Sequence, residues 1–226
     1  MRELESRFRI MVASDFDRTL SSEKDGFVMR REVVEEVNRF SKSYHFVVVT
    51  GRERKYMEVL APGLNPTAWV MENGALLVHK VIDVNAPSNW PSVRTLVEQT
   101  LRRRGVRYSR GEVIIYVDGG RSQKLELDVK GASIEWNRND AMIMPTGVNK
   151  GTGLTKLKEA LNFQGKVIAV GDSENDFALF KVADFKVAVG NALPEVKREA
   201  DLVLDEDDGE GVKKLLKMIE EDELKI

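Results

Sequence analysis

The segment Ser14-Asp15-Phe16-Asp17-Arg18-Thr19-Leu20 follows directly on an apolar run that begins at Phe8. This run has the composition of a buried β-strand, and two carboxylates, Asp15 and Asp17, come just after it. Ligand sites of open α/β sheets form at the carboxyl ends of the strands. Two aspartates this close together repel each other unless a proton or a cation compensates their charge. We therefore expect a ligand site here; the alternative is a pair of loop aspartates that cap a helix.

Short apolar strands alternate with helical patterns on both sides of the middle of the chain, which predicts a parallel α/β sheet. Helical spacing of apolar residues is clear in 30–42, where Val33, Val34, Val37 and Phe40 share one face. The expected strands are 8–14, 45–49, 68–71, 167–170, 185–189 and 202–204, and the expected helices are 30–42, 53–60, 153–161, 176–181, 194–200 and 211–221.

The pattern changes between residues 83 and 145. One helix is expected at 93–104, together with alternating segments at 113–117, 125–127, 132–136 and 141–144. Alternation of apolar and polar residues indicates a half-exposed, mostly antiparallel sheet. We predict an α/β protein with a Rossmann-like parallel-sheet core, formed by 1–82 and 146–226, and an inserted α/β cap, formed by 83–145.

Composition excludes several classes of protein. A hydrophobic content of 42% in 226 residues is enough for a sizeable core and excludes a wholly disordered chain. The 35 basic and 37 acidic residues nearly cancel, so no global field favours a nucleic acid or an anionic membrane as partner. The absence of cysteine excludes disulfides and thiolate metal sites. With no targeting segment and no membrane span expected, we predict a cytoplasmic protein.

A second acidic cluster, Gly171-Asp172-Ser173-Glu174-Asn175-Asp176, follows the predicted strand 167–170. Helix capping is the ordinary explanation for such residues. Acidic clusters at the same ends of two core strands instead indicate a hard divalent cation with oxygen ligands, for which Mg²⁺ fits best. The candidate metal-binding residues are Asp15, Asp17, Asp172 and Asp176.

Two further elements are suited to a phosphate group. Thr50-Gly51-Arg52 closes the strand 45–49, where a hydroxyl and free backbone N–H groups can bind phosphate oxygens. Lys150 precedes a predicted helix and can supply a positive charge to a phosphoryl group or orient a carboxylate. Each feature alone is common in structural roles, but together with the two acidic clusters they predict a phosphate site.

In this order the segments resemble the motifs of the haloacid dehalogenase superfamily of phosphatases. The run from Asp15 to Leu20 resembles its DxDxT motif, Thr50 the second motif, Lys150 the third, and 171–176 the GDxxND form of the fourth. Glu72-Asn73-Gly74-Ala75 and the position of the insertion resemble the branch with a large α/β cap, which includes archaeal phosphoglycolate phosphatases.

The resemblance implies a Mg²⁺-dependent hydrolysis of a small phosphorylated metabolite through an aspartyl-phosphate. Asp15 is expected to attack phosphorus, and Asp17 to protonate the leaving alcohol and then activate water. The metal is expected on the Asp15 carboxylate, the Asp17 backbone carbonyl and Asp172, with Asp176 placing a metal-bound water or Lys150. The residues expected to hold the phosphoryl group are Thr50, Gly51, Lys150 and Asn175.

Several alternatives stay open. Phosphoglycolate is the first choice of substrate, and a sugar phosphate, such as mannosyl-3-phosphoglycerate or sucrose phosphate, is the second. A phosphomutase and a non-catalytic phospho-ligand sensor are less favoured. Arg18 stands where many relatives have glycine, so it either crowds the site or contacts substrate. The basic run 102–110 is explained better by the C-terminal dipole of a helix than by an anion clamp. Both a monomer and a homodimer are compatible with the sequence.

Overall fold

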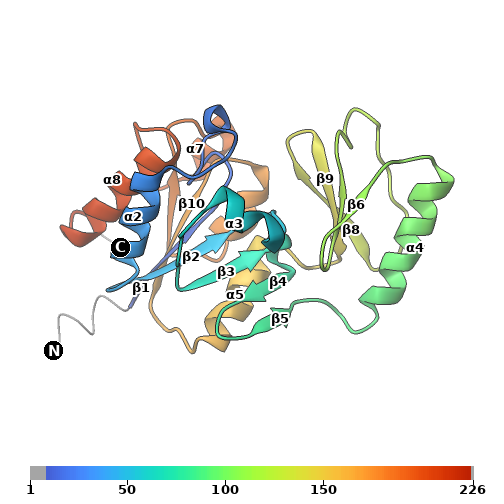
Figure 1. The fold of residues 1–226 in the computed structure, drawn as a ribbon, viewed down its shortest axis with the longest axis horizontal. Helices are drawn as coiled ribbons and strands as arrows, with labels where there is room; N and C mark the ends of the chain where they lie inside the picture. Colours follow the sequence, from blue (N-terminus) through green and yellow to red (C-terminus); the bar gives the residue numbers. More distant parts are fainter. Residues whose placement is uncertain (1–8, 225–226) are drawn as a thin grey trace.

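The computed structural model describes residues 9–224, which form a larger and a smaller α/β unit side by side (Figure 1). The larger sheet has the strand order β12-β11-β10-β1-β2-β3-β4-β5 within these residues. Strands β12 to β3 are parallel, and β4 and β5 are antiparallel additions at one edge. The strands are β1 (Ile10–Ser14), β2 (His45–Val49), β3 (Ala68–Met71), β4 (Leu76–Val78), β5 (Ile82–Val84), β10 (Lys166–Gly171), β11 (Phe185–Ala188) and β12 (Leu202–Val203).

Strand β1 lies at the centre, between β10 and β2. Its residues 11–14 are fully buried, as expected for a parallel strand covered on both faces. Ser14 is in register with Val170 of β10 and Val48 of β2. The three strands therefore end at the same edge, and the loops that follow them meet there.

Helices cover both faces of this sheet. The crossover from β1 to β2 runs toward one edge and that from β10 to β11 toward the other, so right-handed crossovers place their helices on opposite faces. Accordingly, α2 packs against α8, and α5 packs against α6. The apolar face predicted for the first helix is buried. The helices are α2 (Arg31–Phe40), α3 (Met57–Leu60), α5 (Lys150–Ala160), α6 (Phe177–Phe180), α7 (Pro194–Glu199) and α8 (Asp208–Glu220), with 3-10 turns η1 (Glu23–Asp25), η2 (Arg54–Tyr56), η3 (Glu72–Gly74) and η4 (Glu174–Asp176).

The smaller unit is an antiparallel sheet with the order β6-β7-β9-β8 and one long helix, α4 (Trp90–Arg103). It has a hydrophobic cluster of its own, in which Val97 and Leu101 of α4 pack on Ile115 and Ile143 of the sheet. Its strands are β6 (Ser109–Arg110), β7 (Ile115–Val117), β8 (Ala132–Asn137) and β9 (Asp140–Pro145). We call it the cap. The domain boundaries at 82/83 and 145/146 stay a prediction, and β5 runs across the first of them.

The predicted fold class, a parallel-sheet core with an α/β cap, is confirmed, and the differences are local. Residues 125–127 form no strand, although Leu125 is buried in the cap cluster. The antiparallel pair β4–β5 was not expected from the sequence. Helix α5 begins at Lys150 instead of 153, because Asn149 caps it by accepting the Thr152 N–H.

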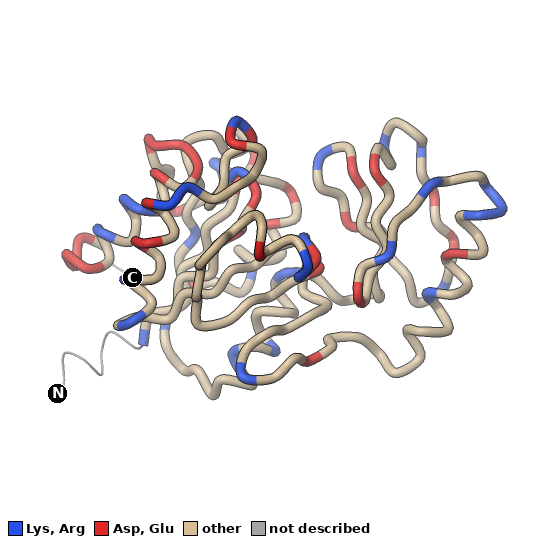
Figure 2. Tube along the Cα trace, viewed as in Figure 1, with Lys and Arg blue, Asp and Glu red and all other residues tan. Residues whose placement is uncertain are grey.

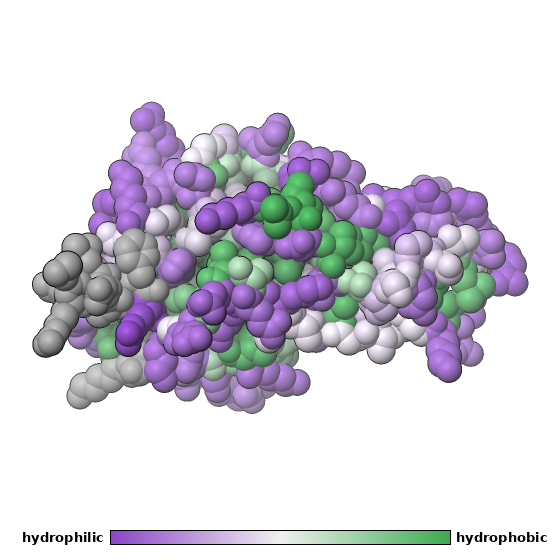
Figure 3. Space-filling view, turned by 90° about the horizontal axis from the view of Figure 1, so that it is seen from below, coloured by the Kyte–Doolittle hydropathy of each residue, from purple (hydrophilic) through white to green (hydrophobic). Residues whose placement is uncertain are grey.

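The surface carries both signs of charge over the core and the cap, with basic positions gathered at the end of α4 (Figure 2). Hydrophilic residues cover much of the face in Figure 3, with hydrophobic ones gathered near its middle. Among residues 9–224, no helix combines the length and the apolar character needed to cross a membrane.

Candidate active site

The loops at the common strand edge hold Asp15, Asp172 and Asp176 in buried positions, and Asp17 in a partly buried one. Asp15 follows β1 and donates its backbone N–H to Val170 at 2.9 Å, which joins the first loop to β10. Asp172 follows β10, and Thr50 follows β2. Asp172 and Thr50 are fully buried, and Asp15 is 4% exposed. The parallel register thus brings residues far apart in sequence into one place.

Lys150 joins the two acidic loops. Its Nζ lies 2.5 Å from Asp15 Oδ1 and 2.6 Å from Asp176 Oδ1, and the side chain has no exposed surface. Burial lowers the pKa of an amine, but here the charges of Asp15 and Asp176 outweigh it, so the pKa of Lys150 is raised above its usual value. The two carboxylates therefore favour the charged form of the lysine.

Asp176 shapes the second acidic loop. Its Oδ2 accepts the backbone N–H groups of Asp172 at 2.9 Å and Ser173 at 3.1 Å, while its Oδ1 binds Lys150. A Cβ atom at residue 171 would lie 2.5 Å from Asp176 Oδ2, so only Gly171 leaves room for this turn. Both Asp176 oxygens thus have partners within the protein.

The acidic loops leave a surplus of negative charge. Asp15, Asp172 and Asp176 each place a carboxylate oxygen within 4.8 Å of the other two. Burial raises the pKa of Asp15 well above its usual range, and burial with the charge of Asp176 raises the pKa of Asp172 to about 6. Lys150 compensates only part of this charge. A buried, all-oxygen donor set with excess negative charge fits a hard divalent cation.

Asp17 does not join this cluster through its side chain. Its carboxylate is held by the fork of Arg52, with Nε at 3.0 Å and one terminal nitrogen at 2.7 Å from Oδ1. Sequence reasoning missed this role of Arg52, although the residue follows the predicted phosphate-binding pair Thr50 and Gly51. The Arg52 guanidinium also lies over the Phe27 ring, 5.0 Å from its centroid.

The remaining predicted residues lie around this centre. Thr50 Oγ1 accepts the Arg52 backbone N–H at 3.0 Å, and Gly51 accepts a hydrogen bond from the Tyr116 hydroxyl of the cap at 2.7 Å. Asn175 is buried, with its Nδ2 3.4 Å from Asn73 Oδ1. Their contacts to a phosphoryl group stay predictions.

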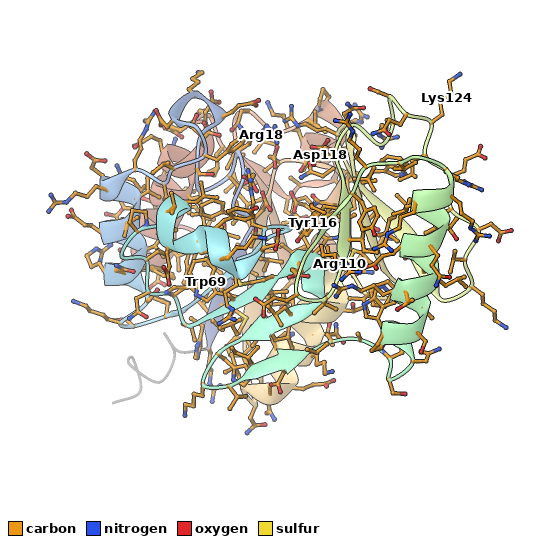
Figure 4. The ribbon with its side chains drawn as sticks, turned by 45° about the vertical axis from the view of Figure 1, so that its right-hand side comes forward. Arg18, Trp69, Arg110, Tyr116, Asp118 and Lys124 are labelled. Carbon is orange, nitrogen blue, oxygen red and sulfur yellow. The ribbon has the colours of Figure 1, made fainter. Side chains whose placement is uncertain are left out.

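A cleft of about 380 Å³ lies between the core and the cap. Figure 4 shows Arg18 on the core side and Tyr116 and Asp118 on the cap side, and all three line it. The arginines predicted to complement the end of α4 do not line this cleft. They bind within the cap instead: Arg102 donates to the Tyr108 hydroxyl, and Arg110 pairs with Glu98. A second cavity, of about 550 Å³, lies beside α4 and β5, away from the acidic loops.

Comparison with known proteins identifies the family of this chain. A family model described as haloacid dehalogenase-like hydrolase matches residues 112–216. The chain is 53% identical over 211 residues to the phosphoglycolate phosphatase of Sulfurisphaera tokodaii, with 92% of this chain and 93% of the relative covered. The chain belongs to the haloacid dehalogenase-like hydrolases. This confirms the predicted family and the predicted enzyme class, a phosphatase of the haloacid dehalogenase type.

A second relative and a solved structure are also similar to this chain. The chain is 51% identical to phosphoglycolate phosphatase 2 of Saccharolobus solfataricus, with 93% of this chain and 92% of the relative covered. A haloacid dehalogenase-like hydrolase from Bacteroides thetaiotaomicron has the same fold, with a TM-score of 0.75, 19% identity, and 92% of this chain and 98% of that chain covered. Phosphatases of this family generally use a divalent metal, and among residues 9–224 the group Asp15, Asp172 and Asp176 could hold one.

Arg18, the residue for which the sequence left two roles open, has an unusual backbone conformation. Its φ is +62°, in the left-handed region that favours glycine. The Arg18 side chain pairs with Glu23 at 2.9 Å and lies over Phe27, with 5.2 Å to the ring centroid. Arg18 therefore forms part of the cleft wall and is held there by Glu23 and Phe27.

Glu72 joins the cap to the core. Its fully buried carboxylate accepts the backbone N–H groups of Glu112 at 2.6 Å, Val113 at 2.8 Å and Ile114 at 2.9 Å. Burial raises the pKa of Glu72, and these three donors act against that rise. Because residues 112–114 lead into β7, Glu72 sets the position of the cap sheet over the site.

We expect Glu72→Ala to lower the free energy of unfolding by about 3 kcal/mol. Each buried N–H group that loses its acceptor costs about 1–3 kcal/mol, and water that enters the space of the lost carboxylate can accept only some of these hydrogen bonds. Glu72→Gln keeps one amide oxygen as acceptor and should lose about half as much. Urea unfolding of both variants measures this. A loss below about 1 kcal/mol for Glu72→Ala would show that the cap is anchored elsewhere.

Proposed function

We propose that this protein hydrolyses 2-phosphoglycolate with the help of Mg²⁺, through an aspartyl-phosphate formed on Asp15. The observation that carries the proposal is the cluster of three buried carboxylates within 4.8 Å, bridged by Lys150 and next to a small cleft. The names of two relatives more than 50% identical over most of the chain support the choice of substrate.

Asp15 is the proposed nucleophile. Lys150 holds Oδ1, so the carboxylate is oriented while the second oxygen, Oδ2, attacks phosphorus. The bond from Oδ2 to phosphorus forms as the ester bond from phosphorus to glycolate oxygen breaks. Water then attacks the phosphorus of the aspartyl-phosphate, which releases inorganic phosphate and restores the Asp15 carboxylate.

Asp17 is the proposed acid and base. It protonates the departing glycolate oxygen and takes a proton from the attacking water in the second step, a contribution that is typically worth about 10²–10⁴-fold. Arg52 fixes the direction of its carboxylate through two nitrogens. This contact explains how an aspartate on a loop keeps one orientation.

Mg²⁺ would be held by the side chains of Asp15 and Asp172 and the backbone carbonyl of Asp17, while Asp176 holds Lys150 and the loop in place. A bound Mg²⁺ supplies a Lewis acid that lets an anionic carboxylate approach an anionic phosphate. Thr50, Gly51, Lys150 and Asn175 are proposed to bind the phosphoryl oxygens. A cytoplasmic location and a monomeric or homodimeric state stay predictions.

The test is phosphate release from a panel of phosphorylated metabolites, with Mg²⁺ and with a chelator. The panel contains 2-phosphoglycolate, hexose phosphates, sucrose phosphate, mannosyl-3-phosphoglycerate and nucleotides. We expect 2-phosphoglycolate to be turned over fastest, with loss of activity in the chelator and recovery when Mg²⁺ is restored. Faster turnover of a sugar phosphate would replace the proposed substrate, and turnover unaffected by the chelator would contradict the metal.

A further inference from the structure

Three arginines line the cleft, and their side chains differ in what they bind. Arg18 is paired with Glu23, and Arg52 holds Asp17 with two nitrogens. Arg138, the one on the cap, is less completely satisfied. Its Nε is buried and has no hydrogen-bond partner among residues 9–224, and one terminal nitrogen lies 3.3 Å from Asp172 Oδ2.

The hairpin that carries Arg138 is well held. Asn137 and Asp140 pair across the turn between β8 and β9, and the Arg138 backbone has a φ of +53°. Its carbonyl oxygen accepts a hydrogen bond from Arg121 Nε at 2.5 Å, and the Arg121 guanidinium lies over Trp136, 4.6 Å from the ring centroid. The guanidinium of Arg138 is therefore presented to the core by a fixed turn.

An arginine with a free Nε beside a terminal nitrogen has the fork that matches a carboxylate. The Arg138 side chain is 39% exposed and lines the cleft, so an anion there can reach the guanidinium and offer the acceptor that its donors lack. The Asp172 carboxylate is a proposed metal ligand, so its charge is shared with the cation when the site is loaded. The guanidinium of Arg138 then has a positive charge that Asp172 no longer balances and donors that are free to bind an anion besides Asp172.

We propose that Arg138 binds the carboxylate of the substrate and so selects phosphate monoesters that carry a carboxylate next to the ester. This inference rests on the proposed function. In 2-phosphoglycolate, only the ester oxygen and one methylene lie between phosphorus and the carboxylate carbon. A phosphoryl group at Asp15 therefore keeps the carboxylate near the acidic loops, where the Arg138 guanidinium already touches Asp172.

The experiment compares two substrates that differ only at this group: 2-phosphoglycolate and 2-hydroxyethyl phosphate, in which a neutral hydroxymethyl group replaces the carboxylate. Steady-state kcat/KM is measured at saturating Mg²⁺ for the parent, Arg138→Met, Arg138→Lys and the cap control Arg102→Met. Arg102 carries the same charge on an exposed side chain outside the cleft. The melting temperature of each variant shows whether it is folded.

We expect Arg138→Met to lower kcat/KM for 2-phosphoglycolate about 10- to 100-fold, mainly through KM, and to change that for 2-hydroxyethyl phosphate less than about threefold. Arg138→Lys should recover part of the loss, and Arg102→Met should match the parent. If the parent prefers 2-phosphoglycolate but Arg138→Met lowers kcat/KM equally for both substrates, or for neither, this inference is wrong and the proposed function still stands. A parent that does not turn over 2-phosphoglycolate would overturn the proposed function as well.

Discussion

Asp15→Asn should lower the rate of phosphate release by at least about 10⁴-fold, because an amide oxygen cannot form the covalent intermediate and loss of a nucleophile costs about 10⁶-fold in comparable cases. The fold should survive the change. Burial raises the pKa of Asp15, so its charged form is disfavoured by folding and a neutral side chain removes that penalty at neutral pH. The melting temperature without metal should therefore be equal to or above that of the parent.

Two measurements separate this role from a structural one. Phosphate release is followed for Asp15→Asn and for the control Asp128→Asn, which changes an exposed aspartate of the cap. Thermal unfolding is followed with and without Mg²⁺, and the stabilisation by Mg²⁺ that we expect for the parent should be smaller in Asp15→Asn. Retention of more than a few per cent of the parent activity by folded Asp15→Asn would exclude Asp15 as the nucleophile.

Lys150→Met should have the largest effect on stability. The lysine has no exposed surface and binds both Asp15 and Asp176, so its removal leaves two buried carboxylates without their cation. Breaking a buried ion pair in this way costs about 3–5 kcal/mol. Activity should fall with it, because Asp15 loses the contact that orients its carboxylate. The matched control is Lys156→Met, an exposed lysine of the same helix.

The pH dependence of Lys150→Met gives a further check. The pKa of Asp15 is raised in the folded protein even with Lys150 nearby, and removal of the lysine raises it more. A folded-state pKa above the unfolded one favours folding at low pH, and that advantage is lost as pH rises through the folded value. Urea unfolding should therefore show the stability deficit of Lys150→Met growing from pH 5 to pH 8. A deficit below about 1 kcal/mol that does not change with pH would contradict the buried bridge.

Much of the site was predictable because parallel strands align their carboxyl ends. The buried runs that end before Asp15, Thr50 and Asp172 are clear in the sequence, and adjacent pairing of β1 with β2 and β10 places these ends together. The spacing of Asp172 and Asp176 also fits a single tight turn, since Asp176 accepts the Asp172 backbone N–H. The sequence pattern and the order of the strands therefore both place these residues at one edge of the sheet.

The contacts across the cleft could not be predicted. Arg52 and Asp17 are 35 residues apart, and Arg138 and Asp172 are 34 apart, and no periodicity links either pair. Glu72 binds backbone N–H groups, which carry no side-chain signal in the sequence. In the cap, Leu125 is buried by packing without sheet pairing, so an apolar pattern there indicated a strand that does not form.

If Asp15 accepts the phosphoryl group, the aspartyl-phosphate can be trapped on this residue. The Mg²⁺-loaded protein is mixed with 2-phosphoglycolate in a single turnover, quenched in acid within milliseconds, digested and mapped by mass spectrometry. We expect the mass of one phosphoryl group on the peptide that contains Asp15, and none in Asp15→Asn. Steady-state phosphate release with no phosphoryl group on Asp15, or with the group on another residue, would exclude Asp15 as the nucleophile.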